Sequence, residues 1–191
     1  MLLYRVFRYS DTAKPGTSGH PLFLVRPQTT GRWDNTAHFD AWYLSRNAEC
    51  AVGETFGDLN VWRDATFTHV FPGGTRSALG IFEAPDTLAV LDLDDAQNLL
   101  DRHLRPTQVA IRNRPATQDI ALRVFNETRS GGARKWDGLS WWSTRWPQWN
   151  PICLWAPPGD TPPFTLKAAE LLTPSHPAVV DAAQTLAKQI L

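Results

Sequence analysis

The chain has 191 residues, a formal net charge of zero and a sequence pI near 7.0. Hydrophobic residues make up 42% and charged residues 20%, which is ordinary for a soluble globular protein of one domain. The neutral balance argues against a direct nucleic-acid binder and against electrostatic attachment to a membrane, and no apolar run approaches the ~20 residues of a membrane span.

The N-terminal segment MLLYRVFRYS is expected to begin the fold with a strand over residues 3–7. Arg5 and Arg8 interrupt its apolar run, so it is too short for a secretory signal peptide. The two cysteines, Cys50 and Cys153, stand outside any CxxC pattern and provide no disulfide framework. Together these features predict a cytoplasmic protein.

Alternating and apolar runs predict further strands, and helical spacing predicts four helices. The strands are expected at residues 21–25, 41–44, 79–83, 88–93, 108–112, 139–143 and 151–155. The helices are expected at residues 47–56, 94–104, 117–128 and 178–190. Strands and helices are mixed without a βαβ rhythm, so we expect an α+β fold in a single domain over residues 1–191.

Tryptophans are concentrated late in the chain, with six of the nine between Trp136 and Trp155. An exposed Trp leaves a large apolar surface in water, so these side chains belong to a core or to the wall of a ligand pocket. The sequence leaves both interpretations open.

Several common kinds of active site are missing from the sequence. There is no P-loop, no G-x-G-x-x-G after a strand and no G-x-S-x-G turn. The five histidines are scattered and form no cluster with cysteine, so we predict neither a metal site nor a bound cofactor. Catalysis would then depend on arginine, carboxylate, hydroxyl and aromatic groups.

Four polar residues of these kinds stand out by position. Arg32 lies in a loop, Tyr43 ends a predicted strand, Glu54 lies on the helix that follows, and Ser143 ends the LSWWS strand. Taken singly, each has a structural interpretation: a loop-bracing arginine, a half-buried strand aromatic, a solvated helix carboxylate and a strand-end hydroxyl. Their joint spacing is what favours a functional interpretation.

The stretch GRWDNTAHFDAWYLSRNAECAVGETFG resembles the signature of RES-domain proteins, which are named for Arg, Glu and Ser. The segment LYRVF, with Arg5, resembles the first strand of that family, and DGLSWWS resembles its serine strand, which places the family serine at Ser143. The resemblance covers about residues 2–156. The sequence departs from the family pattern at Asp34, directly after Gly-Arg-Trp, and at the aromatic crowding around Ser143.

The resemblance implies a fold similar to that of ADP-ribosyltransferases, with a split, mixed sheet around an NAD cleft. It also implies a toxin that degrades NAD by hydrolysis or by phosphorolysis, with NAD as substrate and inorganic phosphate as a second substrate in the latter case. An Xre-type helix-turn-helix antitoxin is the expected partner, and the family often forms homodimers. A protein mono-ADP-ribosyltransferase and a non-catalytic NAD-binding module remain alternatives.

The chemistry of nicotinamide release suggests roles for these residues. Glu54 would stabilise the positive charge that develops on the ribose, and Arg32 and Arg5 would hold the pyrophosphate or an incoming phosphate. Tyr43 would stack on nicotinamide or bond to the ribose, whereas Ser143 would bond to the ribose or the amide and hold Glu54 in place. Two more residues, Trp141 and Arg145, are predicted to line the substrate pocket.

Overall fold

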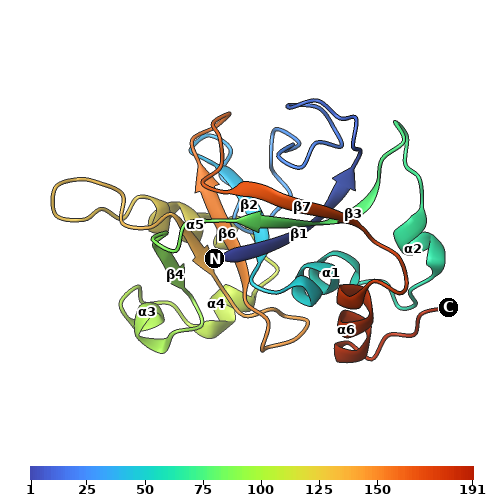
Figure 1. Cartoon of the computed structure of the whole chain (residues 1–191). Helices are drawn as coiled ribbons and strands as arrows, with labels where there is room; N and C mark the ends of the chain where they lie inside the picture. Colours follow the sequence, from blue (N-terminus) through green and yellow to red (C-terminus); the bar gives the residue numbers. More distant parts are fainter.

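A mixed seven-stranded β-sheet organises the chain in the computed structural model, which describes residues 1–191 (Figure 1). Its strands are β1 (Leu2–Tyr9), β2 (Asp40–Ser45), β3 (Arg76–Glu83), β4 (Val90–Asp92), β5 (Gly138–Ser140), β6 (Pro151–Ala156) and β7 (Thr165–Leu171). They lie in the order β4-β5-β6-β2-β1-β3-β7, and only β4 and β5 pair in parallel. The predicted α+β fold, with a mixed sheet and surrounding helices, is confirmed.

Six short helices lie around this sheet. They are α1 (Ala48–Phe56), α2 (Asp64–Thr68), α3 (Ala96–Leu100), α4 (Pro106–Ala110), α5 (Arg114–Phe125) and α6 (Pro177–Thr185). Helices α1 and α6 pack against each other near β1, whereas α3 lies at the opposite end of the molecule, near β4 (Figure 1). None of the helices has the length and apolarity that crossing a bilayer would require.

The strands are buried according to their place in the sheet. All six residues of β6 (PICLWA) are buried between β5 and β2, as expected for an almost uninterrupted apolar run. At the edge of the sheet, β7 is mostly exposed and carries the charged residues Lys167 and Glu170. Charges on an edge strand discourage pairing with another chain, so this edge can stay open to solvent.

The tryptophan-rich segment contributes mainly to the core. Trp141 and Trp155 belong to an apolar cluster that also contains Trp33, and Trp149 belongs to a second cluster with residues of α1 and α6. Trp141 also lines a cavity, as described below. The core interpretation therefore holds for Trp141, Trp149 and Trp155, and the pocket interpretation holds for Trp141 as well.

Some of the predicted elements are wrong. Residues 108–112 do not form a strand, because α4 begins at Pro106 and the backbone N–H of Arg105 donates to the Gln108 side chain, a local cap that favours a helical turn. Residues 21–25 form turns and irregular backbone instead of a strand. Strand β7 was not predicted, since the alternation in its sequence TLKAAEL is broken at Ala168-Ala169 and its pairing with β3 is a long-range contact.

The C-terminal helix was predicted for residues 178–190 but ends at Thr185. Ala187 takes a positive φ of 50°, which stops the helix. Beyond it, the backbone pairs with Trp62: the Trp62 N–H donates to Gln189 and the Leu191 N–H donates to Trp62. These backbone bonds outweigh the helical preference of the last residues.

Candidate active site

The loop that carries Arg32 is held by the carboxylate of Asp34. One oxygen of Asp34 accepts the backbone N–H of Gly31 at 2.6 Å, and the other accepts the Tyr43 hydroxyl at 2.8 Å. The Tyr43 oxygen in turn accepts the N–H of Trp33 at 2.9 Å. A side chain at position 31 would overlap the Tyr43 hydroxyl and Asp34, so the close approach requires glycine there.

Helix α5 fixes the same loop from the other side. The Thr117 hydroxyl donates to the carbonyl of Arg32 at 2.6 Å, and the Gln118 amide donates to the carbonyl of Gly31 at 2.9 Å. The backbone of the loop at Gly31 and Arg32 is therefore held from both sides.

The Arg32 guanidinium lies 5.2 Å from the centre of the Trp33 ring and donates to the carbonyl of Val109. Its Nε is buried and has no hydrogen-bond partner. Burial lowers the pKa of Arg32, and the negative charge of Glu54 acts in the opposite direction. The group therefore has unused hydrogen-bonding capacity close to the Glu54 carboxylate.

Glu54 is held by Ser143, which comes from a distant part of the chain. The Ser143 hydroxyl donates to Glu54 Oε1 and accepts the backbone N–H of Arg145 at 3.0 Å. Ser143 is itself fixed, because its N–H donates to the Trp149 carbonyl at 2.8 Å and its side chain is buried. The Ser143 hydroxyl is thus placed to orient the Glu54 carboxylate.

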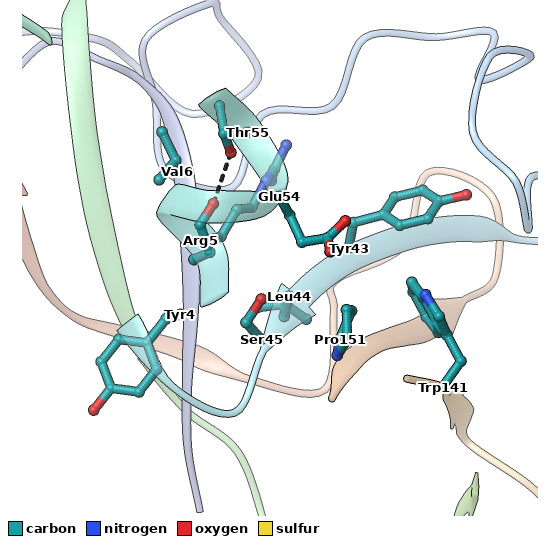
Figure 2. A pocket seen from close by; sticks show the side chains of 11 residues that line it. Tyr4, Arg5, Val6, Tyr43, Leu44, Ser45, Glu54, Thr55, Trp141 and Pro151 are labelled. Atoms are coloured by element: carbon teal, nitrogen blue, oxygen red, sulfur yellow. Dashed lines mark hydrogen bonds between the residues drawn. The ribbon is translucent and has the colours of Figure 1, made fainter. Parts of the chain in front are cut away.

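A small hollow on one side of Glu54, here called the inner cavity, has a volume of about 150 Å³. Figure 2 shows the side chains of Arg5, Tyr43, Glu54 and Trp141 around it, together with apolar residues of β1 and β2. The Tyr43 hydroxyl is already bonded to Asp34 and Trp33, so its ring is the part that the cavity can use. Burial, together with Cys153 and Asp34, raises the pKa of Tyr43, which keeps the phenol protonated.

Arg5 is the only cationic side chain that lines the inner cavity. Its guanidinium lies 5.3 Å from the centre of the Trp42 ring, and its Nη1 is buried without a partner. Burial lowers the pKa of Arg5 to about 10. The residue as a whole is half-buried. A cation partly withdrawn from water without a counter-ion is costly, so its presence favours a role in binding an anion.

A larger hollow that also borders Glu54, here called the outer cleft, has a volume of about 680 Å³. Arg32, Glu54 and Arg145 line it. The Arg145 guanidinium binds the carboxylate of Asp58 in a bidentate pair at 2.9 and 3.0 Å, which lowers the pKa of Asp58. Glu54 alone lines both hollows, so it lies at their junction.

All seven predicted site residues thus fall in one region. Four line the inner cavity (Arg5, Tyr43, Glu54, Trp141), two more line the outer cleft (Arg32, Arg145), and Ser143 bonds to Glu54. No cluster of three or more His, Cys, Asp or Glu side chains in residues 1–191 is arranged to hold a metal ion.

Sequence reasoning missed several residues of this region. Asp34 was noted only as a departure from the family pattern, although its place beside Arg32 was a usable signal. Arg112, Arg114 and Lys188 also line the outer cleft, and no motif or spacing marked them. Their side chains meet the site only through the packing of α4, α5 and the chain after α6.

Comparisons with known proteins concern the family and the fold of the chain. The family model described as "RES domain" matches residues 2–181, which extends beyond the predicted signature region of residues 2–156. Among solved structures, a chain of the M. tuberculosis MbcT-MbcA toxin-antitoxin complex is similar, with a TM-score of 0.59 and 18% identity over 98% of this chain and 89% of that chain. At that identity the likeness concerns the fold alone. No curated protein matches the sequence.

Proposed function

The chain belongs to the RES-domain family, and we propose that it is an NAD-degrading enzyme that cleaves the nicotinamide–ribose bond. The observation that carries the proposal is the position of Glu54, at the junction of a small cavity with aromatic walls and a cationic cleft that contains Arg32. NAD has parts that match these two hollows: a flat nicotinamide at one end suits the aromatic cavity, and an anionic pyrophosphate in the middle suits the cationic cleft.

The proposed mechanism assigns the main electrostatic role to Glu54. Nicotinamide leaves as a neutral ring from a cationic one, so its departure needs no general acid. Positive charge develops on the ribose, and a fixed carboxylate beside that carbon stabilises it. The hydrogen bond from Ser143 sets the direction of the carboxylate before the reaction begins, which is the condition for such stabilisation to be effective.

The attacking group is water in hydrolysis and inorganic phosphate in phosphorolysis. Arg5 lines the inner cavity, so in phosphorolysis it would bind the incoming phosphate. On either route the pyrophosphate of the substrate would lie in the outer cleft with Arg32. The pKa of Arg5, about 10, keeps the side chain cationic at neutral pH in both cases.

We also propose that the protein is the toxin of a toxin–antitoxin pair, with an Xre-type antitoxin as partner. Family membership and the fold shared with a chain of a toxin–antitoxin complex support this proposal. Expression of the chain alone should deplete cellular NAD and stop growth. Normal growth with undiminished NAD would contradict the toxin assignment.

The reaction is tested by incubating the protein with NAD, with and without inorganic phosphate. Free nicotinamide should appear together with ADP-ribose if water attacks, or with ADP-ribose 1-phosphate if phosphate attacks. Glu54→Gln should lower the rate by about 10²–10³-fold, because the neutral amide no longer stabilises the developing charge. Glu49→Gln, on the same helix but outside both hollows, is the matched control.

Full activity of Glu54→Gln would remove that residue from the mechanism. Transfer of labelled ADP-ribose to protein would assign the chain as an ADP-ribosyltransferase, and NAD binding without consumption would assign it as a binding module.

A further inference from the structure

The outer cleft contains more positive charge than the proposed mechanism uses. Its lining includes five basic side chains and two acidic ones. Arg145 is paired with Asp58, and Arg32 lies close enough to Glu54 for the two charges to interact. The remaining three, Arg112, Arg114 and Lys188, form no salt bridge within the chain.

These three residues come from separate segments that the fold brings together. Arg112 and Arg114 lie at the junction of α4 and α5, and Lys188 follows α6. Arg112 and Lys188 both contribute to the low pKa of Asp58, so both lie near that carboxylate. Three unpaired cations around one hollow repel each other, and an anion bound between them would remove that repulsion.

The two hollows differ in size and polarity, and so do the two parts of NAD: the nicotinamide ring is small and flat, whereas the ADP half is larger and carries the negative charge. The inner cavity is small and more than half of its lining residues are hydrophobic, whereas the outer cleft is several times larger and has only two hydrophobic lining residues. Neither of these two, Ala110 and Leu186, is aromatic. Affinity in the outer cleft would therefore come from charge and not from stacking on a base.

We propose that Arg112, Arg114 and Lys188 form an outer phosphate subsite that binds the diphosphate of the ADP half of the substrate. This assignment rests on the proposed function and adds the orientation of the substrate: nicotinamide in the inner cavity, ribose at Glu54 and ADP across the outer cleft. Arginine binds phosphate oxygens through two parallel N–H groups, which suits Arg112 and Arg114 to this task.

Binding of ADP, AMP and inorganic phosphate, measured by titration calorimetry at low salt, tests the subsite without any turnover. ADP lacks the nicotinamide–ribose bond that the enzyme is proposed to cleave, so its binding does not depend on the proposed reaction. We expect ADP to bind more tightly than AMP, and inorganic phosphate to bind least tightly. Arg112→Ala/Arg114→Ala should weaken ADP binding by on the order of tenfold and remove most of the advantage of ADP over AMP.

A double variant with the same loss of charge, Lys14→Ala/Lys167→Ala, is the matched control, because both lysines are exposed and lie outside both hollows. Its affinity for ADP should equal that of the unchanged protein. Arg112 and Arg114 are exposed as well, so their removal should leave thermal unfolding unchanged.

Equal ADP binding by the two double variants would overturn the subsite. Inorganic phosphate would also overturn it by binding as tightly as ADP and losing that affinity in Arg112→Ala/Arg114→Ala, since the outer cations would then hold a free ion and not a nucleotide. The proposed reaction is judged separately. If ADP binds as expected but NAD is not consumed, the subsite is supported and the proposed reaction is contradicted. If NAD is consumed but the two double variants bind ADP equally, only the subsite is contradicted.

If NAD is consumed, kinetics give a second measurement. The KM for NAD should rise about tenfold in Arg112→Ala/Arg114→Ala, whereas the KM for nicotinamide riboside, which lacks the ADP half, should rise much less. An equal rise for both substrates would contradict the proposed orientation.

Discussion

The inner cavity and the outer cleft share Glu54 but differ in how their side chains are held. Around the inner cavity, hydrogen bonds within the protein hold the key side chains: Tyr43 bonds to Asp34, and Glu54 bonds to Ser143. In the outer cleft, Arg112 and Arg114 are exposed and form no ion pair. In the proposed reaction, the inner region would provide fixed geometry for the bond that breaks, and the outer region would provide charge for the part of the substrate that only has to bind.

The difference has a consequence for mutations. Substitutions near the inner cavity should alter stability or the rate of the chemical step, because they disturb a bonded network. Substitutions in the outer cleft should alter binding and its dependence on salt, because solvent-exposed charges are screened. Three substitutions in or next to the inner region test this division.

The largest effect is expected for Asp34→Ala. Its carboxylate is buried and accepts hydrogen bonds from Gly31 and Tyr43, so the substitution leaves two donors without partners. The free energy of unfolding should fall by about 3 kcal/mol, measured by urea denaturation. Asp119→Ala, which removes an exposed partner of Arg123, should change it by less than about 0.5 kcal/mol. A similar, small change in both variants would contradict a fixed inner network.

A smaller effect of opposite sign is expected for Arg5→Met. The substitution removes a buried, unpartnered charge while keeping much of the side-chain volume, so the free energy of unfolding should rise by about 1–2 kcal/mol. NAD turnover should fall at the same time, because the inner cavity loses its cation. Arg8→Met, on the same strand but exposed, serves as the control for both measurements. A less stable but active Arg5→Met protein would show that Arg5 braces the sheet.

Ser143→Ala should have the smallest of the three effects, a fall in kcat of about tenfold, or about 1.4 kcal/mol. Without the serine hydroxyl, Glu54 is free to sample orientations that do not face the ribose. Ser140→Ala is a close comparison, since that buried hydroxyl bonds to Asp92, outside both hollows. Equal rates for the two serine variants would assign Ser143 a structural role only.

Local sequence patterns predicted correctly those elements whose structure depends mainly on neighbouring residues. The alternation in LYRVF placed β1, and the apolar run PICLWA placed β6, because both patterns reflect burial on a sheet. The Arg32–Tyr43–Glu54 spacing also indicated the candidate site, since β2 and α1 follow each other directly and carry two of these residues on adjoining elements.

Tertiary structure decided the features that depend on distant segments. Strand β7 forms because its backbone pairs with the edge of β3. The chain after α6 leaves the helix because its backbone bonds to that of Trp62. Arg112, Arg114 and Lys188 carry no signal of their own, because an exposed basic residue looks the same in sequence whether or not it lines a cleft. By itself, the sequence determined the fold class, the family resemblance and the inner residues. Only long-range packing determined the outer cleft, because the interaction between two charges depends on the distance between them, and the fold sets that distance.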